Sequence, residues 1–433
     1  MNDITAFFAF LKYCLGYKGN MSRVVAGMDW QMLYSFASKQ ALLGLCFEGI
    51  ERLGEEYPEE LKRNPIGREL LMTWMGKAQQ IRRQNRKVNI VASKLFSMLR
   101  EDGMRCCILK GQGNALMYPN PYSRTPGDID VWIHASRERI SEYASKKFEL
   151  EDDIRLQHLE TSLDGVPVEL HFFPCSMNNP IYHARLQKWF RRNADLQCSH
   201  IVGLPDEAGD IAIPTTAFNV VYQLTHLYHH FFDEGIGMRQ IIDYFLVVND
   251  FSKNVFLNND LSNHPVNFSN HPVPLSKEGS TFSPSPSSSG SGDVTALRCS
   301  EPLRSKDGGP SKVSPDCAGW DRLAIEEDNS ASSATAVTSS ASTALVVVQR
   351  ELKYLGLWKF AGAVMYVLHK ALGLPEEKMI APMDEKRGKL LLAEILNGGN
   401  FGKHFTKYGH FTQQGMAKKY FLKIWRNMHF VRY

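Results

Sequence analysis

The chain has 433 residues, a length that accommodates two or three domains with sizeable cores. Hydrophobic residues make up 43% of the sequence and aromatic residues 11%, which is typical of soluble globular proteins. The formal net charge of +4 is too small to indicate nucleic-acid binding by itself.

No run of about 18 uninterrupted apolar residues occurs, so a membrane span is not expected. The first residues form a short amphipathic segment, without the basic stretch and apolar core of a secretion signal. We therefore expect a cytoplasmic protein. The 8 cysteines include no Cys-x-x-Cys pair, which predicts reduced thiols instead of a disulfide framework or a zinc site.

Residues 1–100 show apolar positions at helical spacing, with breaks at Ser22 and at Asn64-Pro65. We predict an N-terminal helical region here. Residues 101–205 instead alternate short apolar strands with helices and end in a hairpin, which predicts a mixed α+β core. The first two strands are expected at 105–109 and 127–134.

Between these two strands, Lys110 and Gly111 stand at a strand-to-helix turn. A helix start presents unpaired N–H groups, so Gly111 could bring the backbone close to phosphates, and Lys110 could neutralise their charge. The alternative is purely structural: Gly111 only makes the turn, and the aliphatic part of the Lys110 side chain packs against the protein while its ammonium reaches solvent. Arg124 offers a planar fork for phosphate oxygens, or it pairs with the acid four residues later.

Asp128 and Asp130 carry the strongest chemical signal in the chain. On a strand, residues two apart project to the same face, so both carboxylates would point together while Ile129 turns away. Such a pair can hold divalent cations used in phosphoryl chemistry. Asp-x-Asp also occurs in calcium loops, but these need more oxygen donors, and the apolar residues that follow indicate a buried strand.

A hairpin is predicted around Asp164-Gly165, a dipeptide suited to a two-residue turn. Counting outward from this turn places Glu160 opposite Glu169 and His158 opposite His171. Glu169 is the leading candidate for a third metal-binding acid, with Glu160 second. His171 could orient a ligand or a carboxylate, although a histidine satisfied within the sheet is the simpler interpretation.

Residues 206–433 return to helical spacing, and we expect a C-terminal helical domain interrupted by a disordered insertion at 251–344, whose composition is Ser- and Pro-rich. His226 and His230 share one helix face, as zinc ligands do. A metalloprotease would carry glutamate where this chain has Leu227, so packing or nucleotide contact is the better interpretation.

The chain contains no acidic residue after Glu394. Basic residues alternate there with aromatic ones, a mixture that could contact a nucleic-acid backbone and its bases weakly. We prefer a terminal amphipathic helix with a solvated basic face. The basic residues are Lys403, Lys407, Lys418, Lys419, Lys423, Arg426 and Arg432.

Several motifs together resemble the DNA polymerase β-type nucleotidyltransferase superfamily, and within it the bacterial group known only as nucleotidyltransferase family proteins. The resemblance covers most of the chain outside the insertion. Its motifs are Leu109-Lys110-Gly111, Tyr118-Pro119, Arg124, Gly127-Asp128-Ile129-Asp130, Val168-Glu169-Leu170-His171, Gly237-Met238-Arg239-Gln240, Asp243, Leu372-Gly373-Leu374-Pro375 and Gly398-Gly399-Asn400-Phe401-Gly402.

The resemblance implies a mixed β-sheet core flanked by helical regions, with two Mg²⁺ ions bound by Asp128, Asp130 and Glu169. It further implies that Lys110 and Gly111 hold nucleotide phosphates. We also predict that Arg124 and Arg239 contact the nucleotide. The superfamily commonly has Gly-Gly or Gly-Ser at the phosphate turn, whereas this chain has Gly111-Gln112-Gly113.

We therefore expect a magnesium-dependent nucleotidyltransferase that binds ATP or another nucleoside triphosphate and moves its nucleoside monophosphate to an acceptor hydroxyl. The acceptor could be RNA, a protein or a small molecule. One alternative is a catalytically degenerate module that binds nucleotide or a protein partner, against which the intact acids count. Another is a glycoside hydrolase with an acid and base pair, which would not need Gly111.

Overall fold

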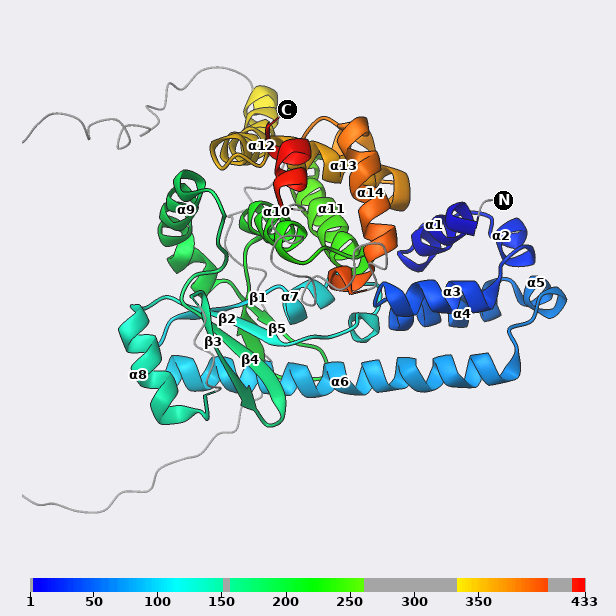
Figure 1. Ribbon diagram of the computed structural model, residues 1–433, viewed down its shortest axis with the longest axis horizontal. Coiled ribbons are helices and arrows are strands. Elements are labelled where there is room, and N and C mark those ends of the chain that lie inside the picture. The colour runs from blue at the N-terminus through cyan, green and yellow to red at the C-terminus, as the bar shows by residue number, and fades with distance from the viewer. Residues whose placement is uncertain (1–2, 151–155, 261–332, 404–422, 433) are drawn as a thin grey trace, which may run out of the picture. The chain divides into compact units, whose positions relative to one another are not determined.

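The computed structural model describes residues 3–150, 156–260, 333–403 and 423–432 of the chain (Figure 1). Six helices come first: α1 (Asp3–Cys14), α2 (Ser22–Ala26), α3 (Trp30–Lys39), α4 (Leu43–Glu56), α5 (Pro58–Arg63) and α6 (Arg68–Glu101). The expected N-terminal helical region is thus present, and α6 alone has 34 residues.

The middle of the chain forms the sheet and the elements around it. They are β1 (Cys106–Leu109), α7 (Gly111–Ala115), η1 (Pro121–Ser123), β2 (Ile129–Ile133), α8 (Arg137–Lys147), β3 (His158–Leu163), β4 (Val166–His171), α9 (Pro180–Ser199), β5 (Ile201–Gly203) and β6 (Asp210–Ala212). The chain therefore has the α+β fold that the sequence predicted.

Helices make up the remaining described part of the chain. They are α10 (Thr216–Asp233), α11 (Met238–Asp260), α12 (Ser333–Tyr354), α13 (Trp358–Leu372), η2 (Glu376–Lys378), α14 (Glu385–Gly398), η3 (Asn400–Gly402) and η5 (Met428–Arg432). The predicted insertion at 251–344 was too wide, because α11 continues to Asp260 and α12 begins at Ser333. Residues 261–332 lie outside the described residues.

The main sheet has four strands in the order β1-β2-β4-β3. β1 and β2 are antiparallel, β2 and β4 are parallel, and β3 and β4 form an antiparallel hairpin. The hairpin register is the predicted one, with Glu160 opposite Glu169 and His158 opposite His171. Asp164 and Gly165 form its turn with φ angles of 51° and 70°, which is why a glycine suits the second position.

The two faces of this sheet pack against different helices. Ile129, Val131 and Ile133 of β2 face the buried side of α6, which contributes Val88, Leu95 and other apolar residues to the same cluster. Since residues alternate between faces along a strand, Asp130 and Trp132 point to the other side. There Trp132 stacks on Phe218 of α10, with ring centroids 6.2 Å apart.

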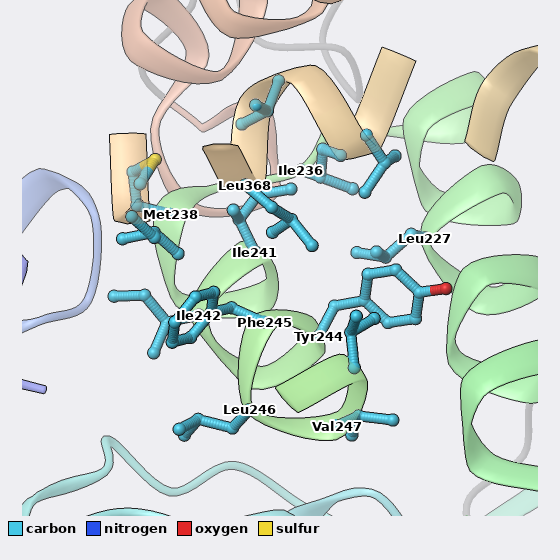
Figure 2. Packing of buried hydrophobic residues seen from close by; sticks show 14 of the residues in the cluster. Leu227, Ile236, Met238, Ile241, Ile242, Tyr244, Phe245, Leu246, Val247 and Leu368 are labelled. Carbon is cyan, nitrogen blue, oxygen red and sulfur yellow. The ribbon is translucent and has the colours of Figure 1, made fainter. Parts of the chain in front are cut away.

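The core of the C-terminal helices surrounds α11, as Figure 2 shows. This helix buries residues on all sides of its first turns, which is typical of a helix inside a protein and not on its surface. Leu227 of α10 and Leu368 of α13 belong to the same cluster. The labelled residues of α11 are Met238, Ile241, Ile242, Tyr244, Phe245, Leu246 and Val247.

The N-terminal helices share this core with the C-terminal ones. Gln40 is fully buried, its side-chain amide donates to the Ile395 carbonyl at 3.0 Å, and its side-chain oxygen accepts from the Met238 N–H at 2.8 Å. Helices from both ends of the chain therefore pack as one body. In the part of the chain that the structure describes, none of the helices combines the length and apolar character needed to cross a membrane.

Candidate active site

A cavity of about 390 Å³ lies between the polar face of the main sheet and helices α10 and α11. The predicted site residues converge on it, although they come from segments far apart in the sequence. Its lining includes Lys110, Gly111, Arg124, Asp128, Asp130, His158, Glu169, His171, His226, Arg239 and Phe401.

The three predicted acids lie along one wall of this cavity. Asp130 is only 6% exposed and sits directly beside Glu169 on the neighbouring parallel strand. Asp128 comes just before β2, not within it as expected, and is more exposed to solvent. The parallel pairing of β2 with β4 is what brings Glu169 to the Asp-x-Asp motif.

Two basic side chains neutralise part of this acid cluster. The Lys110 ammonium donates to Asp130 Oδ1 at 3.0 Å. His171 Nε2 lies 3.1 Å from the same oxygen and 3.0 Å from Glu169 Oε2. Because only 2% of His171 is exposed, these contacts lie in a low-dielectric environment where each is strengthened.

The pKa values of the acids diverge because of these neighbours. The negative charge of Asp130 is the largest of the effects that raise the pKa of Asp128 to about 6. Burial would raise the pKa of Asp130 as well, but Lys110 and His171 outweigh it and hold that pKa below its usual value. Burial opposes the charged form of His171, yet hydrogen bonds to Asp130 and Glu169 raise its pKa to about 9.

Lys110 and Gly111 occupy the predicted strand-to-helix turn. Both have positive φ, 50° for Lys110 and 35° for Gly111. A non-glycine residue in this region is strained, and such strain concentrates at functional sites. The backbone turn directs the Lys110 side chain at Asp130 and at His226 Nε2, which is 3.0 Å from the ammonium. Helix α7 is short, only 5 residues.

Arg124 pairs with Asp243 of α11, not with the nearby Asp128. Its Nε and Nη2 donate to the two Asp243 oxygens at 2.9 Å and 2.8 Å, and the Tyr118 hydroxyl donates to the same carboxylate at 2.7 Å. Asp243 thus anchors α11 to the β1–β2 connection. The third guanidinium nitrogen, Nη1, is buried without a hydrogen-bond partner among the described residues.

Arg239 lies near Arg124 at the start of α11. Its Nη1 donates to the Thr125 carbonyl at 3.1 Å, and its guanidinium sits 5.6 Å from the centre of the Phe401 ring. Arg239 Nε is buried and, within the described ranges, has no hydrogen-bond partner. Among the described residues, Arg124 and Arg239 therefore each offer the cavity one guanidinium donor without a partner.

Two glycine-containing motifs, around Gly237 and around Gly402, lie far apart in the sequence but are in contact in the structure. A Cβ on Gly237 would lie 2.7 Å from Asn400 Cα, and one on Gly235 would lie 3.0 Å from Gly402 Cα. Glycine permits this close approach of two backbones. The contact places Phe401 against Arg239.

A polar stripe on α10 completes the cavity, and most of it was not predicted. Asn219 and Gln223 precede His226 and His230 at helical spacing. Gln223 exchanges two hydrogen bonds with Asn114, at 3.0 Å and 2.6 Å. The i, i+4, i+7, i+11 spacing of polar residues on an otherwise apolar helix is the signal that could have identified this face.

The sequence is similar to that of a known nucleotidyltransferase family. A family model described as uncharacterised nucleotidyltransferase matches residues 26–262, more than half of the chain. No curated protein matches the sequence. The chain is similar to the crystal structure of an antigenic nucleotidyltransferase-like protein from Paracoccidioides brasiliensis, with 18% identity, a TM-score of 0.26, and coverage of 37% of this chain and 75% of that one.

Proposed function

Because the chain belongs to the family of uncharacterised nucleotidyltransferases, as its motifs predicted, we propose that it moves a nucleoside monophosphate from a nucleoside triphosphate to an acceptor hydroxyl, with divalent metal ions. The observation that carries this proposal is the convergence of Asp128, Asp130 and Glu169 on one cavity that Arg124 and Arg239 also line.

The acid cluster fits divalent cations. Asp130 and Glu169 are direct neighbours across two strands, and the charge of Asp130 raises the pKa of Asp128 to about 6. Such crowding of negative charge is relieved by a cation. Asp128, Asp130 and Glu169 would hold two divalent metal ions, which would neutralise phosphate oxygens and ease deprotonation of the acceptor hydroxyl.

Arg124 and Arg239 would bind the triphosphate. Arg124 Nη1 and Arg239 Nε are donors without partners among the residues described, and a phosphate oxygen would satisfy both. Lys110, whose ammonium is 3.0 Å from Asp130 Oδ1, contributes a further positive charge, and Gly111 allows close approach of the backbone. Glu169 would accept the proton of the acceptor hydroxyl.

A transfer assay with each labelled triphosphate tests this proposal. We expect label to appear on an acceptor only with a divalent metal ion, and Asp130→Asn to lower the rate roughly a hundredfold or more, since even groups that only orient metal ligands are worth 10- to 100-fold. The matched control is Asp210→Asn, a carboxylate at the surface of β6, outside the cavity.

Two other outcomes would contradict the proposal. Label transfer that survives Asp130→Asn would remove these acids from the chemistry. Stabilisation by triphosphate without metal dependence and without any transfer would instead support a degenerate nucleotide-binding module.

A further inference from the structure

One group of side chains in the cavity has ligand atoms close enough to share a single metal ion. Among the described residues, His158, Glu169 and His171 each offer one such atom, and the three atoms lie within 4.8 Å of one another. His158 and Glu169 are on adjacent strands of the hairpin, and His171 is two residues beyond Glu169 on the same face. This donor set of two imidazoles and one carboxylate differs from the carboxylates of Asp128 and Asp130.

His158 is oriented as metal-ligating histidines are. It is only 8% exposed, and its Nε2 lies 3.3 Å from Glu160 Oε1. Its other nitrogen, Nδ1, is buried, makes no hydrogen bond to any described residue, and lies 3.5 Å from Glu169 Oε2. A carboxylate on one ring nitrogen fixes the tautomer and leaves the lone pair of the other nitrogen available to a metal.

The distances between the donor atoms are close to those of a bound site. Metal–ligand bonds of about 2.0–2.1 Å in a tetrahedral site separate neighbouring ligand atoms by roughly 3.3–3.4 Å. His171 Nε2 is 3.0 Å from Glu169 Oε2, and His158 Nδ1 is 3.5 Å from that same oxygen. All three donor atoms lie within 4.8 Å of one another, and the two imidazole rings have centroids 4.9 Å apart, so the ring nitrogens would move closer on binding.

We propose that His158 Nδ1, Glu169 and His171 Nε2 form a binding site for a transition-metal ion such as Zn²⁺, Fe²⁺ or Co²⁺, beside the Asp128 and Asp130 carboxylates. The ion would displace to solvent the proton that His171 Nε2 shares with Asp130 and Glu169 in the metal-free protein. Imidazole nitrogen suits these ions, whereas Mg²⁺ favours oxygen ligands in a near-ideal octahedron. The ion on the Glu169 side of the cavity is therefore a transition metal and not magnesium. Any part that this ion plays in catalysis rests on the proposed function, whereas its binding does not.

Titration of the metal-free full-length chain with Co²⁺, followed by visible absorption and in the absence of nucleotide, tests this site. We expect one equivalent to bind with a spectrum of nitrogen ligation, and to stay bound under a hundredfold excess of Mg²⁺. His158→Gln should weaken Co²⁺ binding at least tenfold. The matched control is His134→Gln, a partly exposed histidine outside the cavity, which should bind Co²⁺ like the parent chain.

A second measurement needs no variant, in case His158→Gln does not fold. X-ray absorption of the parent chain loaded with one equivalent of Zn²⁺ should show the scattering pattern of two imidazole ligands. The proposal is overturned if Zn²⁺ has only oxygen neighbours, if folded His158→Gln binds Co²⁺ unchanged, or if equimolar Mg²⁺ displaces Co²⁺. Because none of these readouts involves nucleotide transfer, an inactive protein would still give a clear answer.

Discussion

Arg124 and Asp243 form a buried ion pair beside the cavity. Both are nearly excluded from solvent, with side chains 5% and 6% exposed, and they pair through two hydrogen bonds. Burial raises the pKa of Asp243, but the guanidinium of Arg124 outweighs it and holds that pKa below its usual value. The pair joins α11 to the loop that precedes Asp128 and Asp130.

Removing one partner of this pair should therefore be costly. We expect Asp243→Asn to lower the free energy of unfolding by roughly 3–5 kcal/mol, because it leaves the Arg124 charge buried without compensation. Urea unfolding measures the change. Arg124→Met combined with Asp243→Leu should recover much of the loss, whereas Asp206→Asn, which breaks an exposed pair with Arg86, should leave the midpoint unchanged. An Asp243→Asn chain as stable as the parent would contradict this account.

For single residues, the sequence predicted which acids lie at the cavity better than it predicted which side chains contact Arg124 and Lys110. Asp128, Asp130 and Glu169 were identified by local spacing and by a hairpin count, both of which depend on neighbouring residues. The partner of Arg124 lies 119 positions away, and no local pattern connects the two. The same holds for Lys110, whose contact with His226 spans 116 positions.

The β3–β4 hairpin is the element that the sequence determined most completely. Its turn residues require positive φ, which Asp-Gly supplies, and the register of every later pair follows from that turn. The parallel pairing of β2 with β4 had no such local signal, because a crossover separates the strands. The placement of α10 over the sheet likewise depends on packing of Trp132 against Phe218.

The close contact between Gly237 and Asn400 allows a prediction about how α11 packs against η3. We expect Gly237→Ala to destabilise the protein by roughly 1–3 kcal/mol, because the added Cβ would meet backbone and force α11 and η3 apart. Thermal unfolding measures this effect. Triphosphate binding should weaken as well, since Arg239 and Phe401 lie on the two separated segments.

A glycine with free space provides the control. Gly76 lies within α6, and a Cβ there would meet nothing within 4 Å. Gly76→Ala should stabilise the chain by up to about 1 kcal/mol through helix propensity alone. Equal effects of the two substitutions would show that the close approach at Gly237 has no energetic consequence.

For the molecule as a whole, the cavity couples stability to pH. Burial lowers the pKa of His229 to about 4, although Asp233 and Glu234 oppose that shift while His230 and Lys423 reinforce it. The unfolded chain keeps the ordinary value of 6.5. Between these values the unfolded state binds more protons, so stability is fully present above pH 6.5 and falls as the pH drops toward 4.

Unfolding in denaturant at pH 7.5 and pH 5 should reveal this coupling. We expect His229 to account for a loss of about 2 kcal/mol between the two conditions, estimated from the two pKa values. His229→Gln should remove that part of the loss, while His134→Gln should keep it. A parent chain and a His229→Gln chain with the same pH dependence would contradict the lowered pKa of His229.

The Gln40 side chain, which hydrogen-bonds to both Ile395 and Met238, has a consequence for how the protein folds during synthesis. Its hydrogen bond to Ile395 spans 355 positions, so a ribosome working at about 5–20 residues per second needs roughly 18–70 s to supply the second partner after the first. During that interval the part of α1 that packs against α13 lacks its native partner. Translation of the final helices, and not the emergence of the first ones, is thus the event that lets the chain close its core, and chaperones would have their longest access before it.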